Sequence, residues 1–241
     1  MIVCGLDFEA TSLDVNEARI IEAGAVLWDT ERNVPLKLYS EFVDCRIDIP
    51  EMRLSDETVE VTGITDDLLD AWGMHPRDAL NDINRMAAQA DFVLAHNGSE
   101  YDVHVWRNEL KRHGIENHTP MWADSRTDIV FPERIKTRNL LHLAAEHGFL
   151  PLHGHRAVFD VLTMLQIASR YDWNAIIARA KEPTFFVQAV VSFNEKELAK
   201  ERGYYWAPQQ KVWHKAMKQS DYMREKDECG FKTQLLTVKP E

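Results

Sequence analysis

The spacing of apolar residues along the chain predicts strands at its start, followed by strands that alternate with helices. Three apolar and β-prone segments come first, at residues 2–7, 19–28 and 36–43, and their succession predicts an antiparallel meander. A short apolar strand follows at residues 92–95. Helices are expected, from capping residues or from apolar positions about 3.6 residues apart, at residues 66–70, 76–90, 100–113, 138–147 and 156–171. This order predicts an α/β fold with a mixed central sheet and flanking helices.

The segment Lys181-Glu182-Pro183-Thr184 indicates a boundary between two domains. The elements expected after it are a strand, a charged helix and two short strands, at residues 185–193, 194–202 and 204–215. The chain is therefore predicted to hold a larger domain, residues 1–183, and a small α+β module, residues 184–241.

Composition narrows the classes of protein to which the chain can belong. A hydrophobic share of 45% in 241 residues is sufficient for a sizeable core. No apolar run approaches the roughly 18 residues of a membrane helix, and no basic segment precedes an apolar stretch at the N-terminus, so neither a membrane span nor a signal peptide is expected. Cys4, Cys45 and Cys229 show neither metal-ligand spacing nor an even set for disulfides, which favours a reducing cytoplasm.

The charge is acidic and unevenly spread. A net charge of −11 argues against binding a polyanion over a wide surface, yet it is compatible with an enzyme that collects divalent cations and grips a strand end. Residues 1–183 carry 18 basic and 31 acidic side chains, whereas residues 184–241 carry 10 basic and 8 acidic ones. Acidic residues therefore concentrate in the larger domain.

Three short motifs, far apart in the sequence, carry acidic residues in that domain. They are Asp7-Phe8-Glu9, His96-Asn97 followed by Tyr101-Asp102, and His155-Arg156-Ala157 followed by Asp160. Asp7 and Glu9 are two residues apart on an expected strand, so their side chains leave the same face about 7 Å apart. Such carboxylates repel each other unless a cation lies between them. The alternative is that both are solvated at the end of the strand.

The other two motifs also have structural interpretations. Asp102 lies near the start of an expected helix, where the helix dipole stabilises a carboxylate without any ligand. Asp160 lies in an apolar helical segment that does not place it clearly on the solvent face, so burial beside a cation is plausible. His155 precedes it by five residues and would reach the same site only from the preceding loop. Otherwise His155 is a surface or capping residue.

Together the motifs provide the groups that metal-dependent phosphodiester hydrolysis needs. Oxygen ligands without a cysteine partner favour Mg²⁺ or Mn²⁺. Two such ions can activate water and stabilise the attacking and leaving oxygens. A histidine with a pKa near neutrality can accept the proton of that water.

The order and spacing of the motifs resemble those of the DEDDh 3′–5′ exonucleases, the DnaQ-like branch of the ribonuclease H-like fold. Further similar segments are Asp7-Phe8-Glu9-Ala10-Thr11-Ser12-Leu13 and Thr62-Gly63-Ile64-Thr65, together with Asp124. The resemblance covers about residues 1–171. It implies a ribonuclease H-like mixed sheet, with a three-strand antiparallel meander and additional parallel strands.

The resemblance also implies roles for the five residues of a catalytic site. Asp7 would bridge two metal ions. Glu9 and Asp160 would complete the first metal site, and Asp102 would support the second. His155 would be the general base.

A further set of residues is expected, by the same resemblance, to contact the substrate. Thr11 and Leu13 would hold the terminal nucleotide and stack against it, and Asn97 would organise its loop. The full set is Phe8, Thr11, Leu13, Ile64, His96, Asn97 and Tyr101.

Two positions leave alternatives open. His96 and Asp102 are six residues apart where five is common in the family, so a local loop must absorb one residue, and Glu100 is an alternative to Asp102. His153 is an alternative to His155, although only His155 keeps the family's spacing to the following aspartate.

Aromatic and basic residues interleave in the small module, mainly within residues 198–215. Such a surface could stack bases and neutralise phosphates. Alternatively, Tyr204, Trp206 and Trp213 form the core of a module so small that it needs large aromatic side chains.

The sequence therefore predicts a 3′–5′ exonuclease that uses two Mg²⁺ or Mn²⁺ ions and releases nucleoside 5′-monophosphates from the 3′ end of DNA, preferably single-stranded or frayed. Trimming of RNA is an alternative within the same chemistry. A non-catalytic nucleic-acid-binding or polymerase-associated module is an alternative of another class.

The expected partner is nucleic acid with a free 3′ end, and no contact with a membrane is expected. A homodimer, or a polymerase or repair partner, remains open. Basic residues expected to attract phosphate are Arg107, Lys111, Arg112, Arg134, Lys136 and Arg138.

Overall fold

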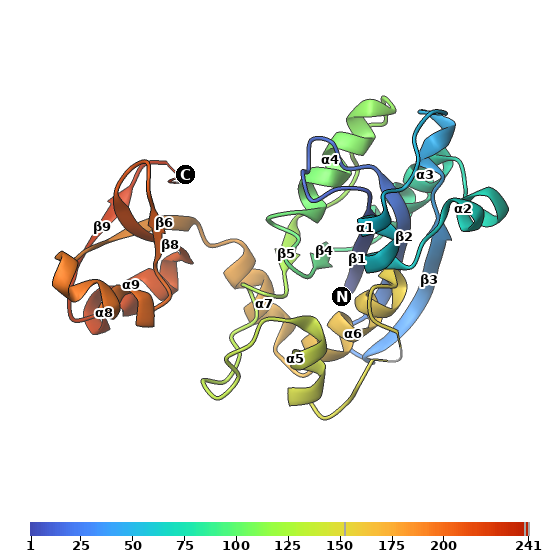
Figure 1. Ribbon diagram of the computed structural model, residues 1–241. Helices are drawn as coiled ribbons and strands as arrows, with labels where there is room; N and C mark the ends of the chain where they lie inside the picture. Colours follow the sequence, from blue (N-terminus) through green and yellow to red (C-terminus); the bar gives the residue numbers. More distant parts are fainter. Residues whose placement is uncertain (152, 239, 241) are drawn as a thin grey trace. The chain divides into compact units, whose positions relative to one another are not determined.

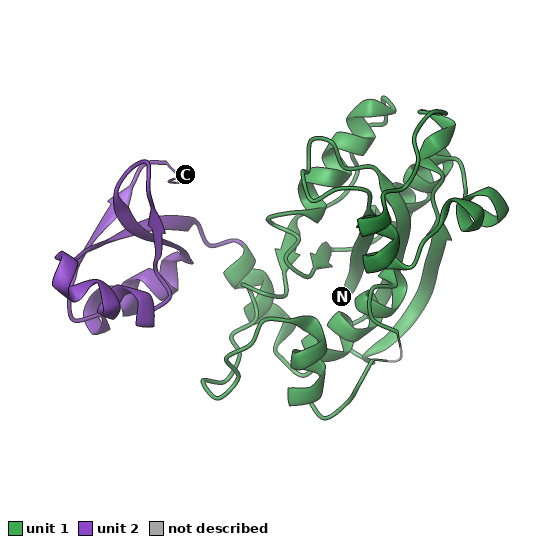
Figure 2. Cartoon of the chain, viewed as in Figure 1, with its two compact units in different colours: residues 1–180 green, residues 181–241 purple. Residues whose placement is uncertain are grey.

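The chain divides into two compact units. The computed structural model describes residues 1–151, 153–238 and 240. Unit 1 comprises Met1–Ala180 and unit 2 comprises Lys181–Glu241 (Figure 2). In the described residues, no helix is long and apolar enough to cross a bilayer.

Unit 1 is built around a mixed sheet with the strand order β3-β2-β1-β4-β5 (Figure 1). The strands are β1 (Ile2–Ala10), β2 (Ile20–Asp29), β3 (Val34–Phe42), β4 (Phe92–Ala95) and β5 (Trp122–Asp124). The first three form the antiparallel meander that the sequence predicted, and β4 and β5 continue the sheet in parallel. The predicted ribonuclease H-like fold is confirmed.

Helices cover both faces of this sheet. They are α1 (Asp56–Thr62), α2 (Asp66–Trp72), α3 (Pro76–Ala87), α4 (Asp102–Arg112), α5 (Leu140–Glu146), α6 (Ala157–Ala168) and α7 (Trp173–Ala180), with a 3₁₀ turn at Cys45–Ile47. α6 packs on one face with α5 and α7, while α3 and α4 pack on the other. The two cores therefore lie on opposite sides of β1.

The alternation of side chains along β1 decides where its acidic residues point. Cys4, Leu6 and Phe8 belong to the core on the α3 and α4 side. Successive side chains of a strand point to opposite faces, so Asp7 and Glu9 lie on the side of α6. The apolar half of the strand is thus buried in one core, while its acidic half faces the first turn of a helix.

α6 begins in direct contact with the middle of the sheet. Gly24 of β2 is the cross-strand partner of Asp7, and a Cβ added at Gly24 would lie 2.4 Å from the main chain of Ala157 and Val158. Any side chain at this position would push α6 away, so glycine is required for the close approach. The contact brings the first turn of α6 beside Asp7.

Unit 2 is a small α+β module with the strand order β7-β8-β6-β9. Its strands are β6 (Thr184–Val190), β7 (Tyr205–Ala207), β8 (Val212–Lys218) and β9 (Lys232–Leu236), and its helices are α8 (Lys196–Glu201) and α9 (Gln219–Glu228), with a 3₁₀ turn at Phe193–Glu195. Tyr204 is buried in its core, and Trp213 packs partly against that core. Trp206 is 46% exposed, so only part of the aromatic set is needed for packing.

Candidate active site

β1 brings two carboxylates into a crowded acidic environment. Burial raises the pKa of Asp7 well above its ordinary value, and the charges of Asp102, Glu9 and Asp160 raise it further. Burial likewise raises the pKa of Glu9 to about 7, with contributions from Glu22 and Asp160. Three segments far apart in the sequence therefore meet at these two residues.

The loop before α6 places His155 and Asp160 together. His155 has a φ of 58°, and this left-handed conformation turns the chain so that its N–H donates to Asp160 Oδ2 at 3.0 Å. Ligand atoms of Glu9, His155 and Asp160 lie within 4.8 Å of one another. Burial raises the pKa of Asp160, while the hydrogen bond from His155 opposes the shift. Two residues five positions apart can thus serve one site, one from the loop and one from the helix that follows it.

Arg156 fixes this loop to the sheet. Its Nε donates to both carboxylate oxygens of Glu22, at 3.0 and 3.1 Å, and its guanidinium lies 5.0 Å from the ring centroid of Phe42. Glu22 is 1% exposed, whereas the Arg156 side chain is 40% exposed, so the pair joins a buried acid of β2 to a partly exposed arginine of the loop. It holds the segment between His155 and α6 against β2.

α4 supplies the remaining carboxylate. Asp102 is its first residue and is 4% exposed. Burial raises the pKa of Asp102 to about 7. The charges of Asp124 and Glu9 also raise this pKa, whereas hydrogen bonds from the N–H groups of Asp102 and Phe8 to the carboxylate lower it. The alternative, Glu100, is an exposed residue. The geometry therefore favours Asp102.

A wide turn absorbs the extra residue before Asp102. The N–H of Val103 donates to the carbonyl of Gly98, five residues earlier, at 3.0 Å, and Asn97 adopts a φ of 64°. Buried Asp124 holds the turn, because it accepts hydrogen bonds from the main chain of Asn97 at 2.9 Å and of Ser99 at 3.1 Å. The turn leads directly into α4, whose first residue is Asp102.

A cleft of about 420 Å³ opens beside the carboxylates. Its lining consists of Asp7, His96, Asn97, Arg126, Arg138, Asn139, Leu140 and Asp160. Acidic groups lie in the cleft together with two arginines, so it can accommodate cations and an anion side by side. Arg138 was among the basic residues expected to attract phosphate. Arg126 was not, because only the tertiary fold brings it to the cleft.

Two residues of the second motif shape the cleft. His96 lies with Nδ1 2.8 Å from Ser125 Oγ and Nε2 2.8 Å from the carbonyl of Arg138, and burial lowers its pKa. Arg126 Nη1 donates to Asn97 Oδ1 at 2.6 Å. His96 thus supports one wall, and Asn97 orients an arginine, in line with its expected role in organising the loop.

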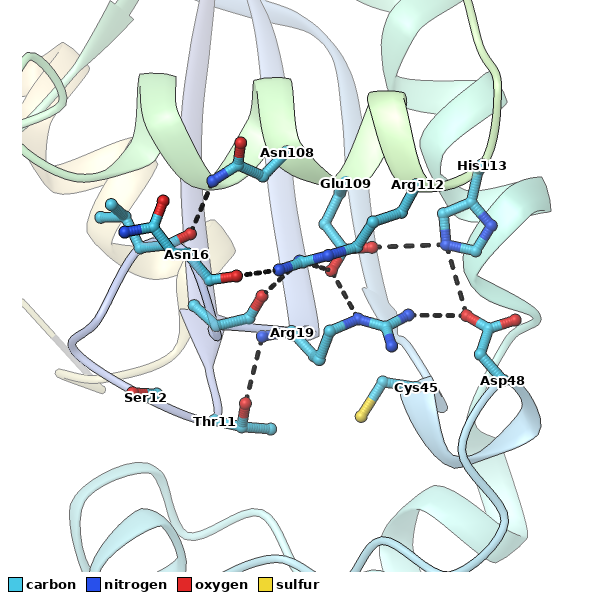
Figure 3. A network of polar contacts seen from close by, with 12 residues as sticks. Thr11, Ser12, Asn16, Arg19, Cys45, Asp48, Asn108, Glu109, Arg112 and His113 are labelled. Carbon is cyan, nitrogen blue, oxygen red and sulfur yellow. Dashed lines mark hydrogen bonds and ion pairs between the residues drawn. The ribbon is translucent and has the colours of Figure 1, made fainter.

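The segment between β1 and β2 carries Thr11 and Leu13, and α4 holds it in place. Tyr101 Oη donates to the carbonyl of Ser12 at 2.5 Å, and Asn108 Nδ2 donates to that of Val15 at 2.8 Å. Thr11 Oγ1 accepts from the N–H of Arg19 at 3.1 Å (Figure 3). Leu13 remains 89% exposed, so it is free to contact a ligand.

A buried polar network completes this attachment (Figure 3). Arg19 donates from Nε to Glu109 Oε1 at 2.7 Å and from Nη2 to Asp48 Oδ2 at 2.6 Å. His113 Nε2 lies 3.3 Å from a carboxylate oxygen of each acid. Arg112 Nη1 donates to Glu109 Oε1 at 2.9 Å and to the carbonyl of Ala18 at 2.7 Å. The network ties the segment to α4 and to the turn after β3.

The side chains of two residues expected to contact the substrate are buried. Phe8 is 5% exposed and stacks on Trp106, with ring centroids 5.8 Å apart. Ile64 is 1% exposed and lies in a separate cluster with Leu69. Both side chains pack in the core, because each lies on the inward side of its segment, and their contact with a substrate stays a prediction.

His153 does not share the position of His155. Its ring packs edge-on against Phe159, with centroids 5.1 Å apart. Of the two histidines, only His155 belongs to the group whose ligand atoms lie close together. The structure thus separates alternatives that the sequence left open.

The donor set fits divalent cations that prefer oxygen. Asp7, Glu9, Asp102 and Asp160 are four carboxylates whose pKa values are all raised. Such a cluster is unfavourable when ionised, and cations that bind it remove the repulsion. Carboxylate oxygens are the ligands that Mg²⁺ and Mn²⁺ prefer.

Comparisons with protein families match both units. A family described as exonuclease (RNase T) matches residues 4–168. A domain family of unknown function, DUF8626, matches residues 185–235. No curated protein sequence matches the chain.

Solved structures of exonucleases share the fold. A zinc-bound complex of E. coli exonuclease I with single-stranded DNA is 18% identical, with a TM-score of 0.63, over 82% of this chain and 49% of that one. The nuclease domain of 3′hExo, a DEDDh family member bound to rAMP, is 21% identical, with a TM-score of 0.56, over 70% of this chain and 90% of that one. The chain therefore spans about half the length of E. coli exonuclease I.

Proposed function

The chain belongs to the exonuclease (RNase T) family, and from this premise we propose that it removes nucleotides from the 3′ end of a nucleic acid strand with the help of two divalent cations. The product of each cycle is a nucleoside 5′-monophosphate. The observation that carries the proposal is the convergence of Asp7, Glu9, Asp102, His155 and Asp160 from three distant segments.

The carboxylates would hold the cations. Asp7, which interacts electrostatically with Asp102, Glu9 and Asp160, would serve both ions, Glu9 and Asp160 would hold one, and Asp102 would support the other. When bound, Mg²⁺ or Mn²⁺ would activate the attacking water and neutralise the charge that develops on the phosphodiester. Without cations, the raised pKa values leave the cluster partly protonated at neutral pH.

His155 supplies the proton acceptor. It lies on an exposed loop next to Asp160 and Glu9, so its ring is accessible to solvent while its main chain is held by Asp160. A neutral imidazole there can take a proton from the attacking water. The attack on phosphorus breaks the bond to the 3′ oxygen of the preceding nucleotide, and that oxygen leaves as the new 3′-hydroxyl.

The cleft and the segment after β1 would hold the terminal nucleotide. Arg126 and Arg138 line the cleft and can pair with phosphate, because guanidinium groups match its geometry. Exposed Leu13 can stack on the terminal base, and Thr11 lies two residues before it on the same anchored segment. The carboxylates themselves repel phosphate, so these groups and the cations must offset that repulsion.

We propose DNA, single-stranded or frayed, as the preferred substrate and the cytoplasm as the compartment. The three cysteines are free and buried, in keeping with a reducing environment. Trimming of RNA is the second candidate, because the sugar is read by few contacts. Both substrates have a counterpart among the similar structures, one bound to single-stranded DNA and one to rAMP.

The test uses a single strand labelled at its 5′ end, prepared in parallel as DNA and as RNA. Incubation with Mg²⁺ or Mn²⁺ should give a ladder that shortens from the 3′ end, faster for DNA. A faster ladder for RNA would replace the proposed substrate. Absence of cleavage with either metal and either strand would refute the function and favour a non-catalytic binding module.

A further inference from the structure

Unit 2 contains a groove of about 550 Å³. It lies where β6 ends and β8 begins, and α8 contributes to one side. Six of its lining residues carry aromatic or basic side chains, namely Phe193, Lys196, Lys200, Trp206, Lys211 and Trp213. This volume is within the range of small-molecule and cofactor sites, and nothing in the proposed function uses it.

The groove is positively charged. Lys196, Lys200 and Lys211 line it, and none of the described residues that line it is acidic. Lys200 pairs with Glu197 at 2.7 Å, but both side chains are largely exposed, and such a pair contributes little stability and is readily exchanged for another anion. Lys196 Nζ lies 3.9 Å from the ring centroid of Phe193, so a cation and an aromatic face are presented together.

The aromatic side chains of the groove are open to solvent. Phe193 is 79% exposed and Trp206 is 46% exposed. Trp206 lies directly opposite Trp213 on the neighbouring strand, with ring centroids 5.5 Å apart. Tyr204, by contrast, is buried in the core of the unit. Phe193 and Trp206 therefore offer apolar faces that the fold itself does not cover.

We propose that this groove binds a short single-stranded segment of nucleic acid, with bases stacked on Trp206 and Phe193 and phosphates paired with the lysines. The proposal rests on the function proposed for unit 1, because it concerns the same strand. Each nucleotide of a strand supplies one base that can stack and one phosphate, and exposed aromatic side chains among lysines match this repeating unit. An acidic peptide would have to supply its rings and charges from separate side chains.

The difference in net charge between the two units gives a reason for a basic groove in unit 2. Unit 1 carries 17 basic and 30 acidic side chains, a balance of −13, whereas unit 2 carries 11 and 9, a balance of +2. Outside the cation site, the acidic unit repels a polyanion. A basic groove with stacking faces adds affinity for a strand that unit 1 alone would hold weakly.

The binding test uses the full chain in EDTA, so that no cleavage occurs, and a fluorescein-labelled oligothymidylate of 12 nucleotides. The double variant Lys196→Ala/Lys211→Ala should bind about 10-fold more weakly at moderate salt. The slope of log K against log salt should fall by about 1.4, since each phosphate contact to a single strand contributes about 0.7. The matched control, Lys37→Ala/Lys226→Ala, removes two exposed lysines outside the groove and should bind more tightly than the groove variant, with a slope near that of the wild type.

A second pair of variants tests stacking. Trp206→Ala should weaken binding of the same oligonucleotide by roughly 5- to 100-fold, the range for loss of a base–aromatic stack. Trp206→Phe should retain most of the affinity, because it keeps an aromatic face. A merely structural role for Trp206 would instead lower the melting temperature in both variants without this difference in binding.

Separate readouts distinguish failure of the groove from failure of the enzyme. Cleavage of a dinucleotide at saturating concentration with Mg²⁺ should be equal in the wild type and in the Lys196→Ala/Lys211→Ala variant. Normal cleavage with unchanged 12-mer affinity and salt slope in that variant would overturn the inference alone. Weakened 12-mer binding in a chain that cleaves nothing would support the groove and refute the exonuclease. If the groove variants lost affinity only for a peptide of aspartate and phenylalanine, the groove would be a protein-docking site and the inference would be wrong.

Discussion

At the scale of single residues, the four carboxylates of the site repel one another electrostatically in the folded chain. Burial raises the pKa values of Glu9 and Asp102 to about 7, against about 4 in an unfolded chain. Between these values the folded protein binds more protons than the unfolded one. The stability that these groups contribute is therefore present below about pH 4 and is lost as the pH rises through about 7.

The upward direction of these pKa shifts predicts how Mg²⁺ and pH together change the stability of the fold. In EDTA, the share of the free energy of unfolding that comes from the site should fall between pH 5 and pH 8. Mg²⁺ should restore it, by about 2.7 kcal/mol at one hundred times its Kd. At one fixed Mg²⁺ concentration the gain should be larger at pH 8 than at pH 5.5, because ionised carboxylates bind the cation more tightly. Thermal unfolding with and without Mg²⁺ measures both effects. The variant Asp102→Asn should be more stable than the wild type in EDTA at pH 8, and a loss of stability there would contradict the assignment.

His155 is predicted to act in proton transfer rather than in metal binding. His155→Ala should lower kcat by about 10²- to 10⁴-fold, with a smaller effect on the affinity for Mn²⁺ measured by calorimetry. His153→Ala is the matched control, because that ring packs on Phe159, and it should retain activity. An equal loss of metal affinity and turnover on His155→Ala would make His155 a ligand.

The sequence indicated the five catalytic candidates because all of them lie in three short motifs that can be recognised without the tertiary structure. It did not indicate Arg126. This residue lines the cleft because β5 pairs with β4 and the chain turns after Asp124. It assigned Phe8 and Ile64 to the substrate, since a motif gives positions but not the direction of each side chain. The sequence also left Glu100 and His153 as alternatives, although the spacing already favoured His155 over His153.

At the scale of elements, the segment after β1 depends on α4 for its position. Arg19 is buried between Glu109 and Asp48 (Figure 3), and burial without partners would leave charges unpaired. The same helix begins with Asp102. One element thus holds both a carboxylate of the site and the segment that would contact the terminal nucleotide.

Arg19→Met should therefore destabilise the fold by about 3–5 kcal/mol, the cost of breaking a buried ion pair on one side. Denaturant unfolding measures it, and adding Glu109→Gln should recover part of the loss. Arg85→Met is the control, because the pair of Arg85 with Asp82 is exposed and contributes about 0–1 kcal/mol. Equal effects of Arg19→Met and Arg85→Met would show that the network does not support the fold.

Elements with a clear apolar period were predictable, and elements without one were not. β2 is apolar along most of its length and was expected almost at its observed bounds. β5 has three residues, and α9 is mostly charged with no buried residue, so neither leaves a pattern. α1, α7 and β9 were missed as well, because tertiary packing rather than local period determines such short elements.

At the scale of the whole molecule, the two units differ in net charge, which is −13 in unit 1 and +2 in unit 2. The proposed cation site lies in the acidic unit, and the basic groove lies in the other. Cations concentrate where acids cluster, whereas a polyanion is attracted elsewhere. The proposed groove would therefore hold the strand away from the acids, while the cleft of unit 1 would receive only its 3′ end.

The most direct test of the central claim compares the wild type with Asp7→Asn and with Asp67→Asn, an exposed acid on α2, on one 5′-labelled DNA strand across a titration of Mg²⁺. Loss of the carboxylate that we propose to serve both cations should cost about 4 kcal/mol or more of transition-state stabilisation, roughly 10³-fold in rate. We predict stepwise loss of nucleoside 5′-monophosphates from the 3′ end by the wild type and Asp67→Asn, and almost none by Asp7→Asn at any Mg²⁺ concentration. Cleavage by Asp7→Asn at the wild-type rate, or shortening from the 5′ end, would contradict it.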